Sequence, residues 1–240
     1  MRNFRVEDTI IYEDREILLC HKSAGIAVQN ARFGTMDLES AIRNYLAFGG
    51  AAGAQRCGKI PYLAVIHRLD QPVEGVLVFA RTPDAARELS RQISGGEMNK
   101  KYLAVTAQAP GDRNEQFLKD FLKKDSKTNT SSVVRRGTPG SKEARLSYKV
   151  LQEIADDRTI SGKRFLVEIH LDTGRHHQIR VQMSHAGMPL LGDRKYNPED
   201  KSNLPLGLCS CELTFIHPAK KKKMKFEISP RGDAFEGFDI

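Results

Sequence analysis

Short apolar segments of strand length outnumber helical ones in this 240-residue chain, and the two kinds do not alternate regularly. Helical spacing is found at residues 37–46 and 84–93, where Asp84 after Pro83 is the expected N-cap, and a third helix is predicted after Gly174 that ends at Gly187. This pattern favours a mixed α+β fold over a doubly wound sheet, in which strands and helices take turns. The predicted strands are residues 8–12, 17–21, 76–80, 102–107, 144–153, 165–171, 209–215 and 224–229.

The segment at residues 65–81 reads V-I-H-R-L-D-Q-P-V-E-G-V-L-V-F-A-R and places one carboxylate, Asp70, just after a basic pair, His67 and Arg68. These residues follow a short apolar run, where a rigid scaffold commonly presents functional side chains. The more ordinary interpretation of the same pattern is a turn residue or an ion pair.

A second segment, residues 173–194, concentrates Arg, His and Gln on the helix that is predicted to follow Gly174. Helical spacing would put His176 and Arg180 on one face. An inward stripe of Ile179, Met183 and Ala186 would anchor the helix in the core.

The chain resembles the RluA-type RNA pseudouridine synthase family. The resemblance is carried by H-R-L-D at 67–70 with Gly75, K-K-Y at 100–102, G-R-H-H-Q-I-R at 174–180 and P-L-L-G-D at 189–193, in the expected order. The opening at residues 12–28 is also similar to the start of that catalytic domain. The chain departs from the family pattern at three positions: Ser23 stands where the family usually has proline, and Gln182 and Met188 stand where it usually has histidine.

The resemblance implies a largely antiparallel, bent central sheet with flanking helices and a catalytic cleft. We expect one pseudouridine synthase catalytic domain over residues 1–240, without an N-terminal RNA-binding domain of the S4 type. The length alone is compatible with one domain or with a domain of two lobes.

The implied catalytic residues are Asp70 as nucleophile, Tyr102 as the active-site tyrosine and Arg180 as the ion-pair partner of Asp70. A carboxylate with a reference pKa of about 3.9 is charged at neutral pH and suits attack near C1′ or C6 of the nucleoside. Without the resemblance, Tyr102 would be read as a core tyrosine on a strand. The expected substrate-binding residues are Arg68, which would take the place of the flipped base, and His67, Arg175, His176 and Gln178.

The reaction that the resemblance implies, conversion of uridine to pseudouridine, involves no net oxidation, so no cofactor is expected. The histidines at 176, 177 and 185 lack a carboxylate or cysteine at metal spacing, and no metal is expected. Cys20, Cys57, Cys209 and Cys211 form no C-x-x-C pair and are interpreted as small buried residues of a reducing compartment.

A net charge of +8 and a pI near 9.3 favour a polyanionic partner, here RNA. The N-terminus lacks a signal-peptide pattern and no segment is apolar enough to span a membrane, so we expect a cytoplasmic protein, most simply a monomer. Lysines 220–223 with Lys225 are either a solvated hairpin tip or a phosphate contact, to which Lys100, Lys101, Arg135 and Arg136 would add. Glycines at 49–58 predict a flexible loop, and the polar, basic stretch 109–142 predicts excursions over the surface.

The leading hypothesis is a cofactor-free RNA pseudouridine synthase that acts on ribosomal RNA, with transfer RNA as the second choice of substrate. An alternative from another class is a catalytically idle RNA-binding or ribosome-assembly protein on the same scaffold. A third hypothesis, a metal-free RNA hydrolase using Asp70 and His67, predicts free uracil or chain scission instead of an isomer.

Overall fold

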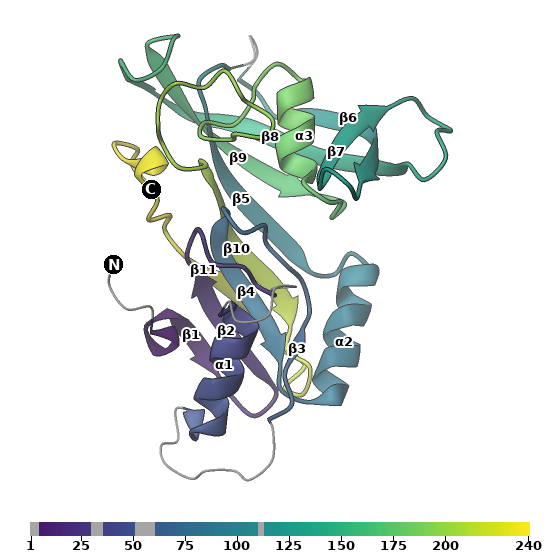
Figure 1. Ribbon diagram of the computed structural model, residues 1–240. Helices are drawn as coiled ribbons and strands as arrows, with labels where there is room; N and C mark the ends of the chain where they lie inside the picture. The colour runs from purple at the N-terminus through teal and green to yellow at the C-terminus, as the bar shows by residue number, and fades with distance from the viewer. Residues whose placement is uncertain (1–4, 30–35, 51–60, 110–112) are drawn as a thin grey trace. The chain divides into compact units, whose positions relative to one another are not determined.

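The structure is a computed structural model that describes residues 5–29, 36–50, 61–109 and 113–240. The chain forms two compact units (Figure 1). The first comprises Met1–Asn99 and Glu212–Ile228, and the second comprises Lys100–Cys211 and Ser229–Ile240. The predicted loop at 49–58, with Cys57, lies almost entirely outside the described residues.

Antiparallel strands form the framework of the first unit. β2 pairs with both β1 and β4, β3 adds to β4, and β10 pairs with β11. All seven residues of β4 are buried, as its continuous apolar run predicts for a central strand. The bounds are β1 Ile10–Glu13, β2 Ile17–Lys22, β3 Ala64–Val65, β4 Glu74–Ala80, β10 Leu208–Ile216 and β11 Lys223–Glu227.

Helices α1 (Leu38–Ala47) and α2 (Pro83–Ser94) accompany these strands, and a 3-10 turn, η1 (Val6–Thr9), precedes them. Ala85 and Leu89 of α2 join the buried core of the first unit, which holds Ile17, Leu19, Val76, Val78, Ala80, Met98, Leu213 and Phe215. The helix begins one residue earlier than predicted. Thr82, not Asp84, is its N-cap, because the Thr82 hydroxyl accepts the N–H of Ala85 and Pro83 occupies the first helical position.

The second unit is built on the antiparallel strand order β5-β9-β8-β6-β7. The sequence predicts surface excursions but no strand over 109–142, and the absence of strands is wrong, since β6 and β7 form a hairpin there. Lys119 and Lys123 lie on the more exposed face of β6 and Leu118 and Leu122 on the more buried one, so charged residues hide a strand with two different faces. The bounds are β5 Asn99–Thr106, β6 Gln116–Asp125, β7 Thr130–Val134, β8 Lys142–Ala155 and β9 Lys163–Leu171.

Helix α3 (Gln178–His185) packs against β6 and β7 (Figure 1), and Val181 on it contacts a small core of Leu122 and Ala144. The helix starts later than predicted, because His177 adopts a left-handed conformation with φ 53°. His176 therefore lies before the helix and shares no helical face with Arg180. The predicted inward stripe holds for Ile179 and Met183, whereas Ala186 is exposed.

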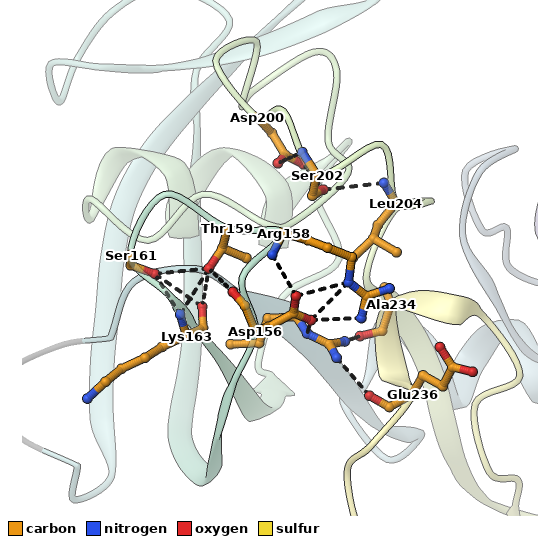
Figure 2. Close-up of polar contacts among 11 residues, drawn as sticks. Asp156, Arg158, Thr159, Ser161, Lys163, Asp200, Ser202, Leu204, Ala234 and Glu236 are labelled. Atoms are coloured by element: carbon orange, nitrogen blue, oxygen red, sulfur yellow. Dashed lines mark hydrogen bonds and ion pairs between the residues drawn. The ribbon is translucent and has the colours of Figure 1, made fainter.

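The C-terminal segment of the second unit is fixed by a buried arginine. Arg164 on β9 donates to the carbonyls of Ala234 and Glu236, at 2.7 and 2.9 Å, and forms an ion pair with Asp156 (Figure 2). The first of these carbonyls belongs to a short 3-10 turn, η3 (Asp233–Phe235), and the second follows that turn directly. Strands outnumber helices in the described residues of both units, which confirms the α+β class.

Candidate active site

Asp70 lies in the first unit, in the loop between β3 and β4, and is partly buried. Its carbonyl accepts the N–H of Val73 at 3.0 Å, which closes a turn. The next carbonyl, that of Gln71, accepts the N–H of Gly25 at 2.8 Å. Hydrogen bonds thus hold the backbone at Asp70 and at the residue that follows it.

Lys22, at the end of β2, is a buried cation beside this loop that the sequence analysis did not single out. Its ammonium donates to the carbonyls of Ser23, Ile26 and Gln71, at 3.1, 2.7 and 3.0 Å, and its residue is 1% exposed. Burial lowers the pKa of Lys22 to about 8, and the carboxylates of Asp70 and Glu74 oppose part of this shift.

His67 and Arg68, which precede Asp70, have different environments. The Nε2 atom of His67 accepts the N–H of Val78 at 3.4 Å, so the ring bridges the loop to β4. Arg68 is exposed. His67 therefore holds the loop, and Arg68 keeps the exposure that insertion into RNA requires.

Tyr102 lies on β5 in the second unit and is 7% exposed. The strand register sets it opposite Ile169 of β9, which in turn lies opposite Tyr148 of β8, so these three residues form one row on one face. Lys100, two positions earlier on β5, shares that face. Burial lowers the pKa of its ammonium to about 8.

Arg180 on α3 is buried in the second unit and forms a bidentate ion pair with Asp193. The Nε and Nη2 atoms of Arg180 each lie 2.7 Å from a carboxylate oxygen of Asp193. The ring of Tyr196 lies over the guanidinium, 5.1 Å from its central carbon. Asp193 belongs to the P-L-L-G-D motif, but no sequence pattern predicts its contact with Arg180, 13 residues earlier.

The backbone at Gly192 explains how Asp193 is placed. Gly192 has φ +72°, and a Cβ there would lie 2.2 Å from the carbonyl oxygen of Pro205, so only glycine fits. The neighbouring Leu191 bonds to β5, its N–H lying 2.8 Å from the carbonyl of Val105. The motif is therefore attached to the strand that carries Tyr102.

The predicted substrate-binding residues at 175–178 mainly hold their own turn together. Gln178 is 3% exposed, accepts from the Thr173 hydroxyl and the Arg175 N–H, and donates to the carbonyl of Arg145. The Nε of Arg175 donates to the carbonyl of Glu143 at 2.8 Å. Direct contact of these two residues with RNA stays a prediction.

His176 and His177 connect this turn to the β6–β7 hairpin. Their rings stack with centroids 3.8 Å apart, and Nδ1 of His176 bonds the hydroxyl of Ser131 at 2.9 Å. The Tyr196 hydroxyl bonds Nδ1 of His177 and accepts the Ser131 N–H, both at 2.8 Å. These contacts place the hairpin, the start of α3 and the residue over Arg180 in one hydrogen-bonded network.

The lysine run lies in the turn between β10 and β11, and parts of it are neutralised. Lys220 donates to Asp14 at 2.8 Å and Lys225 to Glu212 at 3.1 Å. The buried His217 also bonds Asp14, at 2.9 Å. Burial by itself raises the pKa of Asp14. The hydrogen bonds from Lys220 and from backbone N–H groups outweigh it and hold that pKa below its usual range. This favours the solvated hairpin over a dedicated phosphate contact.

Cys20, Cys209 and Cys211 are buried, as expected. The described part of the chain contains no group of three or more His, Cys, Asp or Glu residues arranged to hold a metal ion. None of the helices within it has the length and apolar character to cross a membrane.

Comparison with known proteins identifies the family of this chain. A family model described as RNA pseudouridylate synthase matches residues 16–185. The chain therefore belongs to the RNA pseudouridine synthases, as its RluA-type motifs predict.

Curated relatives give the same result. The ribosomal large subunit pseudouridine synthase D of Zymomonas mobilis is 29% identical over 91% of this chain and 68% of its own length. The protein of that name from Xylella fastidiosa is 30% identical over 91% of this chain, and the chain spans 60% of that relative's length. An uncharacterized RNA pseudouridine synthase of Zymomonas mobilis is 29% identical over 94% of both chains.

Solved structures support the fold. The human RNA pseudouridylate synthase domain containing 1 protein has a TM-score of 0.74 at 20% identity, and it covers 96% of this chain and 86% of its own. The human RNA pseudouridylate synthase domain containing 4 protein has a TM-score of 0.70 at 21% identity, and the match covers 94% of this chain and 90% of that protein's chain. These similarities confirm the α+β pseudouridine synthase fold.

Proposed function

We propose that this protein isomerises uridine to pseudouridine in RNA, with Asp70 as the nucleophile. The observation that carries the proposal is Asp70 itself: a carboxylate in the H-R-L-D motif, in a loop that Lys22 and Gly25 fasten through the Gln71 carbonyl. The reaction breaks the N-glycosidic bond, turns the uracil and joins its C5 to the sugar. It exchanges no electrons with a cofactor and needs none.

Tyr102 and Arg180 complete the proposed site. The tyrosine ring would stack on the uracil, and the arginine would pair with the Asp70 carboxylate. Arg68 would fill the space left by the flipped nucleotide, whose extrusion costs a few kcal/mol.

Ribosomal RNA is the proposed substrate, because relatives over most of this chain are named as ribosomal large subunit enzymes. Transfer RNA is the second candidate. We propose that the protein acts as a monomer on single-stranded or looped segments, where unstacked bases are accessible.

The test is incubation of the purified protein, without cofactor, with unmodified total ribosomal and transfer RNA, followed by chemical mapping of pseudouridines at single-nucleotide resolution. A new site made by the wild type and lost in Asp70→Asn supports the reaction and identifies the substrate. RNA affinity of the variant should stay within about tenfold, since phosphate contacts dominate binding.

A matched control is Asp84→Asn, the same chemical change at an aspartate of the first unit whose side chain is 86% exposed. It should leave the new site intact. Turnover by Asp70→Asn would refute the nucleophile. Free uracil or cleaved RNA would favour the hydrolase, and salt-sensitive binding without any product would favour the idle RNA-binding protein.

A further inference from the structure

We propose that Asp193 is a positioning residue, which sets the orientation of the Arg180 guanidinium for the reaction. The inference rests on the proposed function, because it assigns Asp193 a role that acts through a residue of that site. Asp193 is 1% exposed and reaches Arg180 directly, so it has the geometry for this role.

The first argument is the shape of the contact. A guanidinium that makes one hydrogen bond can still turn about that bond, whereas two parallel bonds to one carboxylate fix its plane. Asp193 binds the Nε and Nη2 edge of Arg180, both contacts being 2.7 Å. These two bonds thereby fix the direction in which the Nη1 side of the guanidinium points.

The second argument is that Asp193 is itself held. Its Oδ1 atom also accepts the N–H groups of Lys195 and Tyr196, at 3.1 and 3.2 Å. The N–H of the preceding Gly192 donates to Asp200 at 2.6 Å. A carboxylate fixed by four donors, two from the backbone and two from Arg180, is a rigid support.

The third argument is the ring of Tyr196, which lies over the same guanidinium and restricts motion out of its plane. Its hydroxyl is fixed to Ser131 of β7. The rotation of Arg180 is therefore restricted by Asp193 in the plane and by Tyr196 above it.

Position matters for a charged group in an active site. A displacement of about 1 Å can cost on the order of 100-fold in rate. The buried pair also stabilises the fold, so the experiment must separate positioning from stability.

A second buried pair of the same unit supplies the control. Asp156, labelled in Figure 2, pairs with Arg164. Both side chains are about as buried as those of Asp193 and Arg180. Arg164 also donates to the backbone carbonyls of Ala234 and Glu236, and neither of these residues belongs to the proposed site. Asp156→Asn should therefore share the stability loss of Asp193→Asn without its catalytic loss.

The experiment measures single-turnover pseudouridine formation and RNA affinity for both variants, with rates corrected for the folded fraction from denaturation curves. We expect Asp193→Asn to lower the rate constant about 100-fold, since it misplaces Arg180. RNA affinity should change by less than about threefold, because phosphate contacts dominate it. The corrected rate of Asp156→Asn should stay within about twofold of wild type, since distant sites act independently.

A double-mutant cycle distinguishes positioning from a general structural effect. If Asp193 acts through Arg180, then Asp193→Asn added to Arg180→Lys should change the rate by less than about threefold, because coupled residues are non-additive. A full loss in that background overturns the inference, and so does an Asp193→Asn rate equal to that of Asp156→Asn.

If Asp193→Asn fails to fold, Asp193→Glu keeps the charge and moves it by one methylene. It should lose about tenfold in rate at unchanged RNA affinity, and a wild-type rate refutes the inference. Absence of product from the wild type refutes the proposed function instead, and the inference with it.

Discussion

Two buried arginine–aspartate pairs in the second unit use the same chemistry for different ends. Arg164 gives its remaining donors to the carbonyls of Ala234 and Glu236, so its pair fastens the C-terminal segment. Arg180 instead donates from Nε and Nη2 to the two carboxylate oxygens of Asp193, and the ring of Tyr196 lies over its guanidinium. The comparison teaches that burial and pairing alone do not mark a functional arginine; what matters is where its other donors lead.

Removal of either arginine should have the largest effect on stability. Arg180→Met leaves the buried Asp193 carboxylate without its arginine partner, which costs about 3–5 kcal/mol. Arg164→Met leaves Asp156 with only the more exposed Arg158 and removes the donor of the Ala234 and Glu236 carbonyls, so we expect a comparable loss. Denaturant unfolding measures this. The exposed pair of Arg87 and Asp84 is the control, and Arg87→Met should cost less than about 1 kcal/mol. A loss below about 1 kcal/mol for only one buried arginine would break the comparison.

The glycines beside the two pairs should differ next. Gly192, with φ +72°, has no room for a Cβ, so Gly192→Ala should destabilise by roughly 2–4 kcal/mol through strain and overlap. Gly162, in the turn next to Asp156, has φ +69° but nothing within 4 Å. Gly162→Ala should therefore cost only about 1–2 kcal/mol of backbone strain. Equal losses in thermal unfolding would show that the contacts of Gly192 relax easily.

The sequence predicted the elements whose pattern is local. β2 and β4 are apolar runs and α2 has helical spacing, and all three were found within two residues of their predicted bounds. The β6–β7 hairpin was missed because lysines on its solvated face make a strand resemble a loop. Local pattern also extended the third helix through His176, since no spacing rule anticipates the left-handed backbone of His177.

Within the site, motifs identified Asp70, Tyr102 and Arg180, and their joint action remains a prediction. Lys22 and Asp193 were missed as site residues because their partners are distant in sequence. Lys22 meets the carbonyl of Gln71, 49 residues later, and Asp193 meets Arg180, 13 residues earlier. Tertiary contacts of this kind leave no periodic signal in a sequence.

Lys22 extends the comparison to a buried cation held by carbonyls instead of a carboxylate. Its pKa falls from 10.5 to about 8 on folding, so between these values the unfolded chain binds the extra proton. Stability should therefore rise with pH across this window, by roughly 1 kcal/mol per pH unit. Urea unfolding measured at several pH values between roughly 7.5 and 9.5 would test this.

Lys22→Met is the matched variant, and its slope should be shallower than that of wild type by the Lys22 contribution. Lys100, whose pKa burial also lowers to about 8, leaves a residual slope in both proteins. Identical slopes would mean that Lys22 is charged in the folded protein up to its usual pKa.

The smallest expected effect concerns Arg158, the outer partner of Asp156. Its side chain is 44% exposed, although it donates to both oxygens of that carboxylate (Figure 2). Because solvent screens an exposed ion pair, Arg158→Ala should destabilise the protein far less than Arg164→Met in denaturant unfolding, and less still at high salt. A loss as large as that of Arg164→Met would mean that Asp156 depends on its outer partner, which would place the strength of this pair at the surface instead of beside the C-terminal segment.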